Sequence, residues 1–170
     1  MEASRANRAR IGVLGCGRVS ARYREVFRDE LTDIADVVAV TDLDRSKSES
    51  FAGDIGGSPV VADMDALFAE KPDLLCILTE SGNHYEHAKK ALEAGINVIV
   101  EKPVALRLEH AEELSRIARE RGLICAEIKQ NRYNPAMRFL RGAMDEGRFG
   151  KLVSVGIRVH WSRDQSYYDD

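Results

Sequence analysis

Short apolar runs alternate with segments of helical periodicity along most of the chain, and this alternation constrains the fold more than any other feature. The runs cover residues 11–14, 37–40, 74–78, 96–100 and 123–126. Their length and unbroken apolar character predict strands that are buried on both faces. Strands that alternate with helices predict βαβ units. They therefore predict an α/β fold with a doubly wound parallel sheet, because each helical crossover returns the chain in the same direction.

The last part of the sequence has a different pattern. Asn134 and Pro135 predict the start of a helix, with Asn as the N-cap and Pro at the first helical position. Residues 153–162 alternate strictly between apolar and polar, which predicts a half-buried antiparallel-type strand outside the parallel sheet. The chain has 170 residues, the size of one domain, whereas a two-domain enzyme of ordinary size needs about twice that length.

Charge, apolar runs and cysteines exclude several classes of protein. The formal net charge of −3 excludes a strongly basic nucleic-acid binder. No apolar stretch approaches the roughly 20 residues of a membrane span, and no signal peptide is recognisable, so we expect no membrane partner. The cysteines at positions 16, 76 and 125 form no C-x-x-C pair and are odd in number, which predicts reduced thiols in a cytoplasmic protein.

The first apolar run leads into a variant of the dinucleotide-binding fingerprint. Gly15 would permit a tight turn, Gly17 the close approach of a pyrophosphate, and Ser20 replaces the third glycine. The second run ends at Asp42, 22 residues after Ser20, where a carboxylate can accept both ribose hydroxyls of NAD and would repel the 2′-phosphate of NADP. The alternatives are a simple glycine-rich turn and, for Asp42, a helix N-cap or turn residue.

Two further segments follow the third and fourth runs. His84 and His87 lie one helical turn apart, but no third ligand has suitable spacing, so we predict no metal site and consider a hydrogen-bonded, half-buried His84 the commoner outcome. Glu101, Lys102 and Pro103 follow the next run. A lysine at that edge of the sheet can assist the deprotonation of a hydroxyl, although taken alone it would be assigned to the surface.

Several of these segments together resemble the glucose-fructose oxidoreductase, inositol dehydrogenase and rhizopine catabolism (Gfo/Idh/MocA) family. The resemblance spans nearly the whole chain, and its segments are residues 11–18, 42, 79–84, 101–103 and 131–135. The Glu-Lys-Pro motif after a strand is the family's hallmark. The resemblance implies an oxidoreductase with a Rossmann-type NAD-binding domain over residues 1–127. It also implies that residues 128–170 supply the first helix and strand of a truncated α+β substrate and oligomerisation domain, and that the enzyme is a homo-oligomer.

The resemblance also implies roles for individual residues. Gly15, Gly17, Arg18 and Val19 would hold the pyrophosphate, Asp42 the adenosine ribose, and Thr79, Ser81 and His84 the middle of the cofactor. Lys102 is the catalytic candidate, beside the substrate and the nicotinamide, with Glu101 nearby.

Residues 150–169 are similar to the branch of the family that oxidises UDP-N-acetyl-glucosaminuronate at C3 in lipopolysaccharide sugar synthesis. By that similarity Arg163, Gln165 and Tyr167 would face a nucleotide-sugar. The sequence departs from the family in two places. Glu80 stands where a proline is usual, and the Asp and His of the C-terminal domain, spaced one helical turn apart, have no counterpart. We therefore expect the N-terminal part of an NAD-dependent dehydrogenase that turns over little or nothing by itself.

Two other functions are considered. The chain could be a stand-alone NAD-binding module that associates with itself or another chain through the strand predicted at residues 153–161, because an unpaired strand edge favours such pairing. A Rossmann-like methyltransferase that uses S-adenosylmethionine is the third possibility, and the Glu-Lys-Pro segment disfavours it.

Overall fold

The computed structural model describes residues 8–165 and 168 of the chain. They form two compact units, which divide between Lys129 and Gln130. The first unit contains all of the regular β-structure that is described, and the second contains one α-helix. The assignment of the second unit to a substrate domain stays a prediction.

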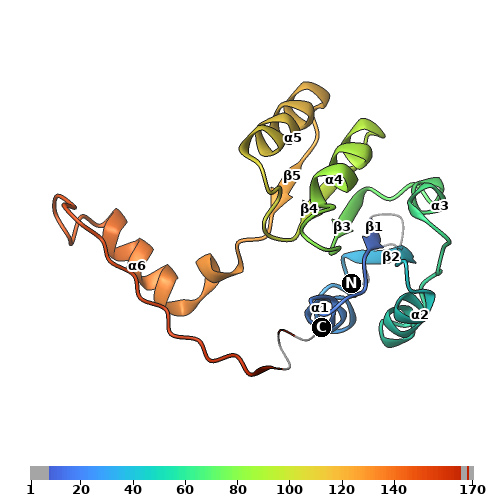
Figure 1. Cartoon of the computed structure of the whole chain (residues 1–170), viewed down its shortest axis with the longest axis horizontal. Helices are drawn as coiled ribbons and strands as arrows, with labels where there is room; N and C mark the ends of the chain where they lie inside the picture. Colours follow the sequence, from blue (N-terminus) through green and yellow to red (C-terminus); the bar gives the residue numbers. More distant parts are fainter. Residues whose placement is uncertain (1–7, 166–167, 169–170) are drawn as a thin grey trace. The chain divides into compact units, whose positions relative to one another are not determined.

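The first unit is built around a five-stranded parallel sheet (Figure 1). Its strands lie in the order β2-β1-β3-β4-β5, and their bounds are β1 Ala9–Leu14, β2 Ala35–Thr41, β3 Leu74–Ile77, β4 Asn97–Val100 and β5 Cys125–Glu127. Each of the five apolar runs supplies one strand. The predicted α/β fold with a parallel sheet is therefore confirmed.

A further strand position lies beside β2 but is reduced to a single bridge. Val40 and Val60 form an isolated parallel bridge, in which the N–H of Val40 donates to Pro59 and the N–H of Val61 donates to Val40. With this bridge counted as the third strand along the chain, the spatial order becomes 3-2-1-4-5-6. That order is the Rossmann order, in which ligands bind at the carboxyl ends of the strands where the winding reverses.

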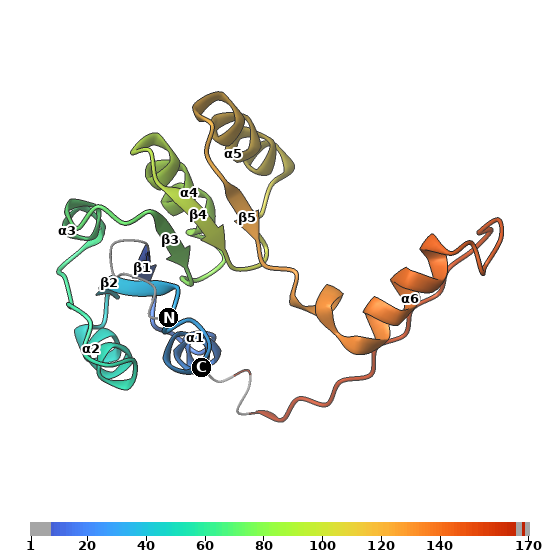
Figure 2. The same cartoon turned by 180° about the vertical axis from the view of Figure 1, so that it is seen from behind.

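Helices cover both faces of the sheet (Figures 1 and 2). One face packs against Phe27 of α1 and Phe51 of α2, and the other against Leu67 of α3, Leu92 of α4 and Leu114 of α5. The bounds of these helices are α1 Ser20–Asp29, α2 Arg45–Asp54, α3 Met64–Ala69, α4 His84–Glu93 and α5 Leu108–Arg121. Burial on both faces explains why the strands are apolar without alternation.

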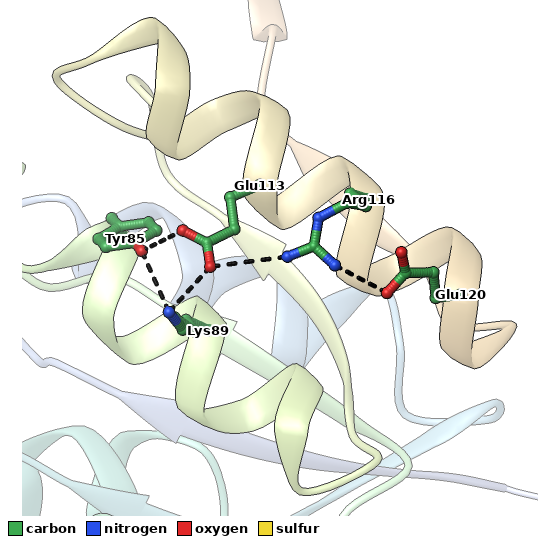
Figure 3. A network of polar contacts seen from close by, with 5 residues as sticks. All are labelled: Tyr85, Lys89, Glu113, Arg116 and Glu120. Carbon is green, nitrogen blue, oxygen red and sulfur yellow. Dashed lines mark hydrogen bonds and ion pairs between the residues drawn. The ribbon is translucent and has the colours of Figure 1, made fainter.

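Helices α4 and α5 are also joined by polar contacts on the side away from the sheet (Figure 3). The hydroxyl of Tyr85 donates to Glu113 over 2.5 Å, and Nζ of Lys89 lies 2.9 Å from the same carboxylate. Arg116 extends the network from Glu113 to Glu120. These contacts fix the spacing of two helices whose inner faces form part of the core.

The second unit begins with the short 3-10 helix η2 (Gln130–Tyr133), followed by α6 (Pro135–Asp145). Asn134 occupies the N-cap position of α6, but its side chain makes no capping hydrogen bond. The strand predicted at residues 153–162 is wrong for this structure, since these residues form no β-strand. A strand exists only through ladder hydrogen bonds, and no such bond to this segment is found among the described residues.

None of the helices in the described part of the chain is both long and apolar enough to cross a membrane.

Candidate functional site

A cleft of about 630 Å³ opens at the carboxyl ends of β1, β2 and β3. The loop after β1 lines it with Gly15, Gly17, Arg18 and Val19. The remaining walls come from residues 41–44 and Lys47, from residues 62–64, and from residues 78–80 with Asn83 and His87. The cleft therefore lies where the doubly wound topology predicts a ligand site.

The glycine turn after β1 is held closely against the end of β3. Gly15 has φ +94°, and a Cβ added to it would lie 2.8 Å from the backbone carbon of Leu78 and the backbone nitrogen of Thr79. Gly17 differs, because a Cβ there would meet no atom within 4 Å. Ser20 is buried, and its hydroxyl donates to the carbonyl of Gly17 over 2.7 Å. The turn thus requires glycine at position 15 for its own folding, whereas Gly17 borders open space.

Asp42 is anchored by the backbone on both of its carboxylate oxygens. The N–H of Cys16 donates to Oδ2 over 2.6 Å, and the N–H of Asp44 donates to Oδ1 over 2.8 Å. These bonds fix the carboxylate at the edge of the cleft while each oxygen keeps a lone pair for another donor. Asp44, and not Asp42, is the N-cap of α2, since its side chain accepts from the N–H of Ser46.

Cys16 lies inside the glycine turn and is buried. Burial and the neighbouring Asp42 raise the pKa of its thiol to about 12. At neutral pH the thiol is therefore protonated and a poor nucleophile, because the thiolate is the reactive form.

Two histidines follow the end of β3 and have different environments. His84 is buried, and both of its ring nitrogens contact backbone carbonyl oxygens. His87 lines the cleft, and its Nδ1 lies 3.1 Å from Oγ1 of Thr79. Burial lowers the pKa of His87, which favours the neutral ring. No group of three or more His, Cys, Asp or Glu side chains in the described residues is arranged to hold a metal ion.

The segment after β4 carries the Glu-Lys-Pro motif. Glu101 is buried, its Oε1 accepts from the hydroxyl of Tyr23 over 2.8 Å, and its Oε2 accepts from the N–H of Lys102 over 3.0 Å. The bond between Lys102 and Pro103 is cis. The side chain of Lys102 is exposed. The carboxylate of Glu101 thus anchors the backbone of Lys102.

The structure brings only part of the predicted site together. Six of the predicted cofactor residues line the cleft, and these are Gly15, Gly17, Arg18, Val19, Asp42 and Thr79. Ser81, His84, Glu101 and Lys102 are not among its lining residues. Arg163 and Gln165 belong to the second unit, and Tyr167 lies outside the described residues. The predicted role of each of these residues is still a prediction.

Sequence reasoning missed several residues of the cleft wall. Lys47 and Met64 come from α2 and α3, which the apolar pattern did not reveal, and Asn83 precedes α4. The spacing of His87 from His84 raises only the question of a metal site and does not predict a place in the cleft wall. The available signal for Lys47 and Met64 was a pair of capping residues, since Asp44 and Asp63 each accept a hydrogen bond from the first turn of the helix that follows.

Comparisons with known proteins agree with this geometry. A family model described as "Oxidoreductase family, NAD-binding Rossmann fold" matches residues 9–128. Among solved structures, the WlbA dehydrogenase of Chromobacterium violaceum in complex with NADH and UDP-GlcNAcA superposes with a TM-score of 0.89 at 30% identity. That match covers 96% of this chain and 47% of the WlbA chain.

Curated relatives give a consistent result. The D-glucoside 3-dehydrogenase of Escherichia coli strain K12 is 31% identical over 88% of this chain and 43% of its own length. The UDP-N-acetylglucosamine 3-dehydrogenase of Acidithiobacillus ferrooxidans is 30% identical over 79% of this chain and 41% of its own length. The chain therefore spans less than half the length of these relatives.

Proposed function

The chain belongs to the Gfo/Idh/MocA family of oxidoreductases and carries its NAD-binding Rossmann fold, and on that basis we propose that it forms the cofactor-binding part of a dehydrogenase that acts on a sugar or nucleotide-sugar. The cleft at the carboxyl ends of β1, β2 and β3 is the observation that carries the proposal. Its glycine turn opens onto the N-terminus of α1, where a helix favours phosphate. The anchored carboxylate of Asp42 fits a ribose.

The proposed reaction is the transfer of a hydride between a hydroxyl-bearing carbon and the cofactor. When bound, the nicotinamide supplies the carbon that accepts or returns the hydride. Gly15, Gly17, Arg18 and Val19 would hold the pyrophosphate, and Thr79, Ser81 and His84 would contact or position the middle of the cofactor. Nζ of Lys102 would hydrogen-bond the substrate hydroxyl and assist removal of its proton. Glu101 would hold the backbone of Lys102 in place through the bond to its N–H.

NAD is the proposed cofactor in preference to NADP. The carboxylate of Asp42 can accept hydrogen bonds from ribose hydroxyls, and its charge would repel a 2′-phosphate. Asp44 adds a second acidic side chain to the same wall, and Lys47 provides one positive charge there.

The finer part of the proposal concerns the substrate. We propose oxidation at C3 of UDP-N-acetyl-glucosaminuronate, as in lipopolysaccharide sugar synthesis, with Arg163, Gln165 and Tyr167 facing the nucleotide-sugar. The similarity of residues 150–169 to that branch of the family supports this choice. A WlbA dehydrogenase with NADH and UDP-GlcNAcA as its ligands is also among the similar structures.

Calorimetric titration of the chain tests the cofactor proposal. NAD is expected to bind, NADP to bind more weakly, and S-adenosylmethionine not at all. Absence of NAD binding by the folded chain would contradict the proposal, and binding of S-adenosylmethionine would favour a methyltransferase.

Steady-state reduction of NAD with UDP-N-acetyl-glucosaminuronate tests the catalytic part, with UDP-N-acetylglucosamine and a simple glucoside as comparison substrates. We expect the 170-residue chain to show little or no turnover, since it spans only 43% of the D-glucoside 3-dehydrogenase. Turnover equal to that of a complete dehydrogenase would disprove this expectation. Faster reduction with either comparison substrate would change the proposed sugar.

Self-association is a second candidate function. The second unit exposes large apolar side chains, among them Val153, Ile157 and Trp161. Such side chains favour association. We propose that these residues join copies of the chain into a homo-oligomer, either of the enzyme or of an NAD-binding module without catalysis.

A further inference from the structure

Two buried ionisable side chains contact the segment that carries Lys102. Thiols aside, His84 and Glu101 are the only ionisable residues of the described chain that are buried, with exposed fractions of 1% and 7%. Glu101 accepts the N–H of Lys102, and His84 contacts the carbonyl oxygen of Pro103. Glu101, a potential anion, and His84, a potential cation, therefore both bind the backbone of the Glu-Lys-Pro segment.

The hydrogen bonds of His84 indicate which form of the ring is present. Nδ1 lies 2.7 Å from the carbonyl oxygen of Pro103, and Nε2 lies 2.7 Å from the carbonyl oxygen of Thr79. A carbonyl oxygen can only accept, and a neutral imidazole has only one N–H. In a neutral ring, one nitrogen lone pair would face an oxygen lone pair at hydrogen-bond distance, in a place that water does not reach. Only the imidazolium, which has two N–H groups, donates to both oxygens.

Glu101 provides a buried charge of the opposite sign. Each of its oxygens accepts a hydrogen bond, one from the hydroxyl of Tyr23 and one from the N–H of Lys102. Both hydrogen bonds found for this carboxylate among the described residues come from donors, and an ionised carboxylate can only accept. Burial and this bond to Glu101 also raise the pKa of Tyr23, which keeps its hydroxyl as a donor.

Other ionisable groups lie on the segments that His84 joins. Glu80 belongs to the turn that provides the carbonyl of Thr79, and His87 lies one helical turn further along α4. The lowered pKa of His87 keeps that ring neutral, so it adds no positive charge beside His84. Lys102 is exposed.

We propose that His84 is held as an imidazolium that ties the turn after β3 to the segment after β4, whose Lys102 N–H is bound by the carboxylate of Glu101. The two N–H···O bonds make His84 a positioning residue for the segment of Lys102 and for the wall of the cleft at Thr79. The charge state of the ring stands on the geometry alone. Its importance for Lys102 rests on the proposed function.

Nitrogen-15 NMR of the whole chain at neutral pH tests the charge state directly. The chain has four histidines, and the variants His87→Gln, His110→Gln and His160→Gln each remove one of the other three ring signals. The signals that remain in all three variants belong to His84. We expect both of its ring nitrogens to carry a proton that exchanges slowly with water. A signal from one unprotonated ring nitrogen would overturn the proposal.

Two amide variants test the tie between the segments. The side-chain nitrogen of Asn in His84→Asn can occupy the place of Nδ1 and donate to Pro103, whereas the nitrogen of Gln in His84→Gln can occupy the place of Nε2 and donate to Thr79. We expect faster amide hydrogen exchange in residues 79–83 for the first variant and in residues 101–104 for the second. Equal changes in both segments, or none in folded variants, would contradict the tie.

The tests of His84 can succeed or fail independently of the tests of the proposed function. The ring signals and amide exchange are measured without cofactor or substrate, so they test His84 even if NAD does not bind. If wild-type chain binds no NAD while His84 is doubly protonated, the proposed function fails and the inference about His84 stands.

Discussion

Single residues at the cleft have requirements of two kinds, those of the fold and those of the ligand. Gly15 shows the first kind, because its backbone conformation and its contact with Leu78 and Thr79 exclude a side chain. We expect Gly17 to show the second, because its Cβ position meets no protein atom within 4 Å and the proposed pyrophosphate would lie against it. The two glycines of the fingerprint are thus expected for two separate physical reasons.

Alanine substitutions separate these causes. Gly15→Ala should destabilise the fold by about 2 kcal/mol or more, since the left-handed conformation is strained for alanine and the new methyl group overlaps backbone atoms. Gly17→Ala should unfold at the wild-type temperature but bind NAD more weakly. Thermal unfolding and calorimetric titration of both variants provide the measurements. Equal stability of the two variants would contradict the assignment.

We expect Asp42 to combine both kinds of requirement, because its carboxylate accepts the N–H of Cys16 in the glycine turn and the residue lines the cleft. Asp42→Asn should weaken NAD binding about tenfold, which is the loss expected for a hydrogen bond to a charged group. NADP should lose less, because the repulsive charge is gone. Calorimetry with both cofactors measures the two affinities, and Asp33→Asn, an exposed substitution, is the matched control. An unchanged ratio of the affinities would refute the role in cofactor choice.

At the scale of elements, predictability depends on burial. The five apolar runs predict strands well because strands with two buried faces need unbroken apolar sequence. Helix α2 is not predicted by its apolar pattern, because only three of its ten residues, Ser48, Phe51 and Ala52, are buried. The alternation at residues 153–162 identifies a face but not a partner, and without ladder bonds no strand forms. The neighbours of Glu101 and His84 come from distant segments, so spacing along the chain does not reveal them.

The polar network between α4 and α5 makes a contribution to folding stability that depends on pH. Hydrogen bonds from Tyr85 and Lys89 lower the pKa of Glu113 below its ordinary value of 4.5. A lowered folded-state pKa means that the contribution to stability is complete above the unfolded value and is lost as the pH falls through the folded value. The contribution is small, because the group lies near solvent.

Glu113→Gln should therefore lower the unfolding temperature at pH 6 to 8 and have a decreasing effect below about pH 4.5. Thermal unfolding across this range measures the difference from wild type. The neighbouring Glu112, which is exposed on the same helix, supplies the control variant Glu112→Gln. A difference from wild type that grows on acidification would contradict the network's role.

At the scale of the whole molecule, the two units differ in how far their large apolar side chains are buried. Apolar side chains from the strands and helices of the first unit form two buried clusters, although Leu43 and Leu108 of this unit are exposed. The second exposes Val153, Ile157 and Trp161, with Phe139 on α6 exposed as well. Apolar surface of this kind is typical of interaction sites.

The chain should therefore associate in a concentration-dependent manner through its second unit. Sedimentation velocity over a range of concentrations measures the association. The double substitution Ile157→Ser with Trp161→Ser should weaken it, whereas Ile34→Ser removes an exposed apolar residue from the first unit and should not. A wild-type chain that sediments as a monomer at every concentration would contradict association through these residues and exclude the self-associating module.

The position of β1 inside the sheet also bears on how slowly this strand opens compared with ligand exchange at the cleft. This strand pairs with β2 on one side and β3 on the other, and it leads directly into the glycine turn. Amides in such a strand exchange with solvent only in rare, large-scale openings of the unit. We therefore expect the turn to be attached to a slowly opening segment. We also expect a ligand to bind and leave the cleft without unfolding of the core.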